Sequence, residues 1–126
     1  MRLKALTTTT MMETRKSSAL RLLGLARRAG AIAPGTESVR RAIRDGEALL
    51  ILMAEDASSV QMKKIRTTQD DGSIPRVTLG DRATLGAAVG MAELSALAVT
   101  QASFANRLVE ELEGSDGGDS TDAVEA

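Results

Sequence analysis

The segment from Ala48 to Ala54 is a continuous apolar run, ALLILMA, and neither face of a strand formed by it would show a polar side chain to water. A strand of this composition has to be covered on both faces, as the central strands of α/β proteins are. Segments with a helical spacing of apolar residues stand before and after the run, so helices are available for both faces. The run therefore predicts a sheet that lies between two layers of helices.

Helical and extended segments alternate along the rest of the chain, and glycine or a helix-capping residue stands at most boundaries. Ser58 or Ser59, and Asp81, are the expected N-caps of two helices. The pattern predicts an α/β protein, a three-layer α-β-α sandwich with about four strands. We expect helices over 17–30, 36–46, 58–66, 83–89 and from 100 or 103 onwards, and strands over 31–33, 48–54, 74–79 and 94–100.

The chain of 126 residues is short enough for one domain, which we place at residues 17–112. Residues 1–16 contain a threonine run and no apolar stretch suited to a signal peptide or a membrane span, so we expect a flexible segment. In that case Met11 or Met12 could be the true initiator. Their basic, hydroxyl-rich character leaves an organelle transit peptide as the alternative. Residues 113–126 are acidic and poor in large apolar side chains, which predicts a disordered tail.

Charge is distributed unevenly along the chain, although 16 Lys and Arg nearly balance 17 Asp and Glu overall. Residues 1–109 hold 16 basic and 10 acidic side chains, a net charge of +6, whereas residues 110–126 hold 7 acidic and no basic ones. A basic folded body of this kind predicts a polyanionic partner.

Several residue types that carry chemistry are missing. The chain has no Cys and no His, which excludes Ser-His-Asp, Cys-His and zinc hydrolase mechanisms. It has no Trp or Tyr and only Phe104, so it lacks the aromatic platform on which single-strand binders stack bases. Glu55 and Asp56 follow the apolar run and could bind Mg²⁺ or act as acid and base, but a helix cap and a solvated loop residue explain them better. We therefore expect no catalytic residues, no metal and no cofactor.

The segment from Pro34 to Gly46 is the most informative one for binding. Gly35 at a helix entry lets another backbone approach closely, and the free N–H groups and the helix dipole there favour an anion or a base edge. Arginines then extend the positive surface along the same helix, at Arg40, Arg41 and Arg44, and would contact phosphates. The alternative is an ordinary surface helix whose arginines only interact with water.

Three stretches of the sequence, taken together, resemble the kink-turn RNA-binding ribosomal protein superfamily, which contains the archaeal and eukaryotic large-subunit proteins seven-Ae and thirty-e. The chain is most similar to its bacterial YlxQ-like branch of small RNA-binding proteins. The resemblance covers about residues 19–109 and rests on LLGLARRAGAIAPGTESVRRAIRDGEALLILMAEDAS, VTLGDRATLGAAVG and ALAVTQASFANRL, in that order. It implies a mixed four-stranded sheet, with RNA bound along one edge.

The resemblance also implies a site. In kink-turn binders the entry of the second helix contacts the sheared G·A pairs, and a later basic residue holds the RNA backbone. Gly35 matches the family's glycine, whereas Glu37 stands where these proteins usually carry Asn, Ser38 where they carry Glu, and Arg41 where they carry Lys. The loop that covers an extruded base in the family is here 91–94, Met91-Ala92-Glu93-Leu94.

We therefore expect a non-enzymatic, cytoplasmic RNA-binding protein that is ribosome-associated or similar to ribosomal proteins. Its partner would be structured, kink-turn-like RNA such as ribosomal RNA, with no membrane and no small-molecule substrate. The predicted RNA-binding residues are Gly35, Thr36, Glu37, Ser38, Arg40, Arg41, Arg44, Met91 and Ala92. The alternative is a protein-interaction module that kept the fold and lost specific RNA binding, which the residues at Glu37 and Ser38 allow.

Overall fold

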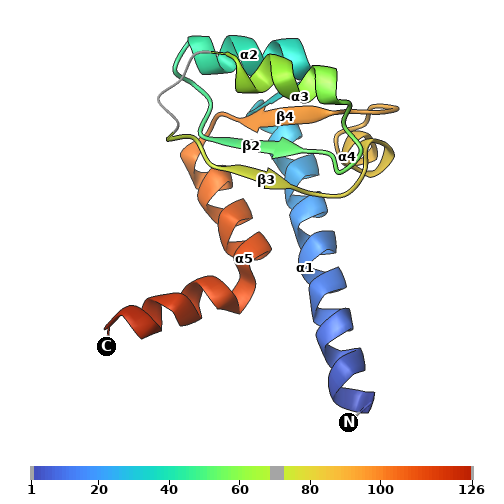
Figure 1. Cartoon of the computed structure of the whole chain (residues 1–126), viewed down its shortest axis with the longest axis vertical. Helices are drawn as coiled ribbons and strands as arrows, with labels where there is room; N and C mark the ends of the chain where they lie inside the picture. Colours follow the sequence, from blue (N-terminus) through green and yellow to red (C-terminus); the bar gives the residue numbers. More distant parts are fainter. Residues whose placement is uncertain (1, 69–72, 126) are drawn as a thin grey trace.

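The computed structural model describes the backbone of residues 2–68 and 73–125 and the side chains of residues 14–68 and 73–113. Helices and strands alternate over these residues and form a sheet between two helical layers (Figure 1). The elements are α1 (Arg2–Arg28), β1 (Ile32–Pro34), α2 (Thr36–Arg44), β2 (Leu50–Met53), α3 (Ser59–Arg66), β3 (Arg76–Thr78), α4 (Arg82–Ala88), β4 (Ala96–Val99) and α5 (Ala102–Glu125). The α/β class and the α-β-α layering predicted from the sequence are confirmed.

The sheet has the strand order β1-β4-β2-β3. β4 is antiparallel to both of its neighbours, with Ala33 opposite Ala98 and Leu52 opposite Leu97, whereas β2 and β3 run parallel. The sheet is therefore mixed, as the resemblance implies. The apolar run at 48–54 supplies β2, an internal strand, which explains why it has no polar face.

The two central strands divide their side chains between two separate cores. On one face Leu50, Leu52, Leu97 and Val99 pack with residues of α1, α4 and α5. On the other face Ile51 packs with the apolar side of α2 and α3, and β4 contributes only alanines. Alternation along each strand thus assigns large side chains to one core and mostly smaller ones to the other.

Local sequence explains where the short helices begin. The hydroxyl of Ser58 accepts a hydrogen bond of 3.1 Å from the amide of Gln61, and Asp81 Oδ1 accepts one of 2.8 Å from the amide of Thr84. Both are the predicted N-caps. In α1 the buried face is formed by Ala19, Leu22, Leu23 and Ala26, whereas Leu25 is 51% exposed.

The two terminal helices extend through the segments for which the sequence predicts no regular structure. The backbone of α1 is helical from Arg2, and that of α5 is helical to Glu125. Neither segment contains proline, and adding a residue to a nucleated helix is easier than starting a new helix, although the glycines within 113–126 disfavour helix there. Packing against the sheet begins at about Ala19 in α1 and ends at Leu112 in α5. The division of the chain into 1–16, 17–112 and 113–126 stays a prediction.

Candidate nucleic-acid interface

Four connections meet at one end of the sheet, and backbone hydrogen bonds join them. The amide of Gly35, after β1, donates a 2.9 Å bond to the carbonyl of Ala96, and the amide of Ala54, after β2, donates a 2.9 Å bond to the carbonyl of Ser95. The amide of Glu55 donates a 2.7 Å bond to the carbonyl of Gly80, which follows β3. The helix entry at 35–38 and the loop at 91–94 are therefore neighbours, although more than fifty residues separate them in the chain.

Gly35 determines how the chain enters α2. Its φ of 101° and ψ of 151° lie in a region that is open almost only to glycine. No side chain caps the helix at this residue, so the first N–H groups, those of residues 36–38, have no intrahelical or side-chain acceptor. The positive end of the helix dipole adds to these groups. This end of α2 is thus built to receive an acceptor from another molecule.

Glu37 and Arg40 interact with each other on the first turns of α2. Arg40 Nη1 lies 3.2 Å from Glu37 Oε2, and Arg40 Nε donates a 3.0 Å hydrogen bond to Thr68 Oγ1. Thr68 Oγ1 in turn donates a 2.8 Å bond to the carbonyl of Lys64 at the end of α3. Arg40 therefore ties α2 to α3 and pairs with Glu37, while its predicted contact with phosphate stays a prediction. Sequence alone could not show this, because Thr68 is 28 residues away.

Arg41 and Arg44 differ from Arg40 in their surroundings. Both are exposed, and neither forms an ion pair with any residue that the structure describes. They belong to the outer side of α2, because Val39, Ala42 and Ile43 fill the inner side. Two unpaired guanidinium groups on the helix that presents the free N–H groups suit contacts with a phosphate backbone.

Backbone hydrogen bonds to α4 hold the loop at 91–94 in place. The amide of Met91 donates a 2.8 Å bond to the carbonyl of Gly86, and the amide of Leu94 donates a 3.0 Å bond to the carbonyl of Arg82. Leu94 is buried, while Met91 and Ala92 are exposed. The loop therefore offers a small apolar surface beside the entry of α2.

Two residues of this interface were not among the predicted ones. A Cβ at Gly86 would lie 2.8 Å from the carbonyl oxygen of Met91 and 2.9 Å from Glu93 Cα, so only glycine lets the loop pack on α4. Arg82 lies between two acidic residues: its Nε is 3.4 Å from Asp56 Oδ2, and its Nη1 is 3.7 Å from Glu93 Oε1. An isolated glycine inside a helical pattern is a signal for close packing, whereas nothing in the local sequence indicates the role of Arg82.

The carboxylates after β2 and β3 serve as helix caps. Asp56 Oδ1 accepts a 2.8 Å hydrogen bond from the amide of Arg82, the first residue of α4, while Ser58 caps α3. The amide of Thr84 holds the pKa of Asp81 below its ordinary value of 3.8 because it donates to the ionised carboxylate. Among the described residues, no three potential metal ligands come together. Within the same part of the chain, no helix is both long and apolar enough to cross a bilayer.

The fold and this interface define a class: an α-β-α sandwich with a mixed sheet, in which one helix entry and the loop before the antiparallel central strand form one surface. Residues 17–109 match the family described as "Ribosomal protein L7Ae/L30e/S12e/Gadd45 family". The chain belongs to this family.

Individual relatives agree with this assignment. The chain is 39% identical over 88 residues to the RNA-binding protein YlxQ of Bacillus subtilis (strain 168), an alignment that covers 70% of this chain and 88% of the relative. It is 29% identical over 104 residues to the RNA-binding protein YlxQ of Enterococcus faecium, covering 82% of this chain and all of the relative.

Solved structures share the fold. One from Bacillus halodurans C, described as a protein with unknown function, has a TM-score of 0.69 at 33% identity and covers 75% of this chain and 96% of that one. The Giardia lamblia 15.5kD RNA binding protein has a TM-score of 0.63 at 19% identity and covers 81% of this chain and 88% of that one. The latter similarity concerns the fold alone.

Proposed function

We propose that this chain is a non-enzymatic RNA-binding protein that binds structured RNA through the N-terminus of α2 and the adjacent loop at 91–94. The observation that carries the proposal is the uncapped entry at Gly35 next to that loop, with unpaired Arg41 and Arg44 on the same helix. The YlxQ relatives are named as RNA-binding proteins, which supports the same conclusion. A ribosomal RNA partner, association with the ribosome and a cytoplasmic location stay predictions.

Each part of the interface has a distinct task in this mechanism. The free N–H groups of residues 36–38 donate to base edges or phosphate oxygens at a kink. Arg41 and Arg44 contact phosphates on the flanking strand. Met91 and Ala92 cover an unstacked base with apolar surface, which partly replaces the aromatic residues that the chain lacks.

The ion pair between Glu37 and Arg40 bears on specificity. A free carboxylate beside a helix N-terminus would repel phosphate, but Arg40 neutralises Glu37 within the helix. Glu37 therefore keeps the ability to accept a hydrogen bond from a base amine without adding a net negative charge to the surface. This arrangement is compatible with RNA, although Asn is the more usual residue in kink-turn binders.

Binding to a kink-turn RNA, compared with the same RNA whose G·A pairs are changed to Watson–Crick pairs, tests this function. We expect tighter binding to the kinked RNA. Arg41→Ala should weaken it and reduce the slope of log affinity against log salt by about 1, since one phosphate contact is lost. Arg107→Ala is the matched control, because Arg107 is exposed on α5, on the other face of the sheet.

Equal affinity for the two RNAs would refute kink-turn recognition, and an unchanged Arg41→Ala variant would refute the assigned surface. A protein-interaction role is the second candidate. Val60, 60% exposed, and Met62, 37% exposed, favour it because they place apolar surface on the outside of α3. Copurification of a protein without nucleic acid, together with no RNA binding at low salt, would support that role.

A further inference from the structure

A groove between the C-terminal turns of α1 and α4 adjoins the loop at 91–94. It has a volume of about 480 Å³ and is lined by Gly24, Arg27, Arg28, Ala88, Val89 and Gly90. Gly90 is followed directly by Met91, so one wall of this groove continues into the loop of the candidate interface. We call it the α1/α4 basic groove.

Two arginines and no acidic residue line the α1/α4 basic groove among the residues that the structure describes. Arg27 Nη1 donates a hydrogen bond to the carbonyl oxygen of Val89 at the end of α4, which fixes Arg27 and offsets the negative end of that helix dipole. Arg28 is exposed and has no ion-pair partner among the same residues. One guanidinium group is therefore positioned and the other is free, in a hollow with a positive charge.

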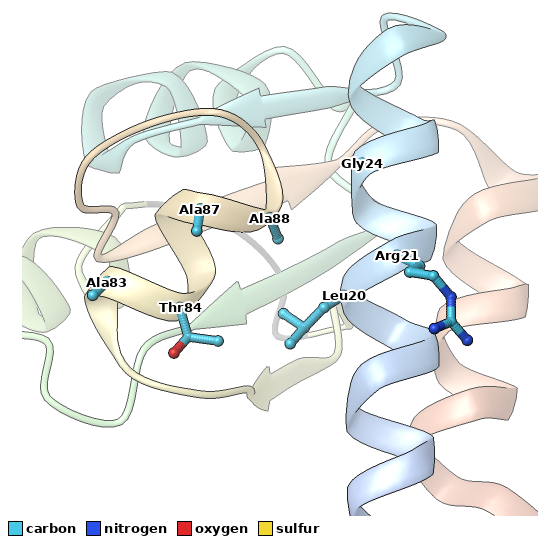
Figure 2. A pocket seen from close by; sticks show the side chains of 7 residues that line it. All are labelled: Leu20, Arg21, Gly24, Ala83, Thr84, Ala87 and Ala88. Atoms are coloured by element: carbon cyan, nitrogen blue, oxygen red, sulfur yellow. The ribbon is translucent and has the colours of Figure 1, made fainter.

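A second, more apolar groove of about 600 Å³ continues from the first and shares Gly24 and Ala88 with it. Figure 2 shows Leu20 directed towards α4 and Arg21 directed away from it. The remaining walls are the small side chains of α4, Ala83, Thr84, Ala87 and Ala88. The two grooves together offer cations at one end and a shallow apolar floor beyond.

We propose that the α1/α4 basic groove binds the sugar-phosphate backbone of an RNA strand that extends beyond the kink held by α2. The positive charge of the groove favours an anionic RNA strand over a peptide with few acidic residues. The connection through Gly90 and Met91 places the groove next to the proposed RNA site. The apolar floor accepts the ribose and base faces of the next nucleotides. This inference rests on the proposed function and adds a second point of contact to it.

Three RNAs separate this proposal from the function on which it rests. One is a minimal kink-turn RNA, and the other two carry a single-stranded extension of about eight nucleotides, each on a different strand. This length is typical of strand-binding grooves. We expect the wild-type protein to bind one of the extended RNAs roughly threefold to tenfold more tightly at low salt. Arg28→Gln should abolish this gain and leave the affinity for the minimal RNA within about twofold.

Arg28→Lys keeps the charge and should restore most of the gain, and Arg107→Gln should change neither affinity. If no extension tightens binding by the wild-type protein, or if Arg28→Gln weakens minimal and extended RNA equally, the groove is not a strand-binding site, while the α2 interface stands. Failure of the wild-type protein to bind the minimal RNA would instead overturn the proposed function. Circular dichroism of each variant establishes that it is folded.

Discussion

The amide of Gly35 donates a hydrogen bond of 2.9 Å to the carbonyl oxygen of Ala96. This single backbone contact joins the entry of α2 to the first residue of β4, and hence to the loop that precedes it. The two parts of the proposed RNA interface are thus held together by main chain rather than by side chains, so their relative position depends on the conformation of Gly35.

Replacement of Gly35 by alanine should strain this junction. An added Cβ meets no atom within 4 Å, so the effect comes from the backbone angle and not from a clash. We expect a loss of about 1–3 kcal/mol in the free energy of unfolding and a clear loss of RNA affinity. Urea denaturation and RNA titration measure the two effects.

Gly46→Ala is the matched control for this change. Gly46 also has a positive φ, 73°, and open space around its Cβ position, but it lies after the other end of α2. The Gly46→Ala variant should lose about 1–2 kcal/mol in the free energy of unfolding and keep its RNA affinity. Equal losses of affinity in both variants would show that general destabilisation, rather than the helix entry, controls binding.

Replacement of Gly86 by alanine should act by a different route. Its Cβ would lie under 3 Å from the backbone of Met91 and Glu93, which cannot yield as a flexible side chain can. We expect about 1–3 kcal/mol of destabilisation and weaker RNA binding through displacement of the loop. Ala87→Ser, at an exposed position of the same helix, should change stability by no more than about 0.5 kcal/mol. A Gly86→Ala protein with parental stability would contradict the close packing seen here.

Arg40 and Arg41 should separate stability from binding although they are adjacent in sequence. Arg40→Ala removes the hydrogen bond to Thr68 and should cost about 1 kcal/mol of stability, whereas Arg41→Ala should weaken RNA binding and leave stability nearly unchanged. A double-mutant cycle with Thr68→Val should give a coupling energy of about 1 kcal/mol for Arg40 and near zero for Arg41. If Thr68 were coupled to Arg41 and not to Arg40, Arg40 would be the arginine assigned to the phosphate contact.

Asp81 should contribute a small acid-dependent part of the stability. Its pKa is lowered in the folded protein by the amide of Thr84, so its stabilising effect is present above the ordinary pKa of 3.8 and is lost as pH falls through the lower folded value. Asp81→Asn keeps the capping geometry without the charge. The stability difference between parent and variant, measured by urea denaturation from pH 6 down to pH 2.5, should shrink towards acid pH, and a constant difference would contradict this cause.

The elements of the fold followed from local signals. The apolar run at 48–54 specified an internal strand, and the caps at Ser58 and Asp81 specified where two helices begin. The composition of the terminal segments predicts flexibility at 1–16 and disorder at 113–126, and these expectations stay predictions. The first strand was predicted one residue too early, and the edges of the other three were placed one or two residues too wide, since pairing partners, not composition, end a strand.

The candidate site was less accessible to sequence reasoning. The entry at Gly35 and the exposed Arg41 and Arg44 are local features of one helix, and they were found. Arg40 and Arg82 owe their roles to residues that are distant in the sequence, so no local pattern could assign them. Gly86 carries a local signal, an isolated glycine inside a helical pattern, but only the folded chain shows that the loop at 91–94 packs on it.

The sequence by itself determined the order and type of most elements, the basic character of the body and the helix whose N-terminus is open. Only the tertiary structure decided which segments share a surface, because the strand order β1-β4-β2-β3 places Gly35 beside Ala96 and brings the loop at 91–94 to the entry of α2. It also decided which arginines are free. Internal partners such as Thr68 and Val89 use some of the N–H donors of Arg40 and Arg27, and these partners come from elsewhere in the chain.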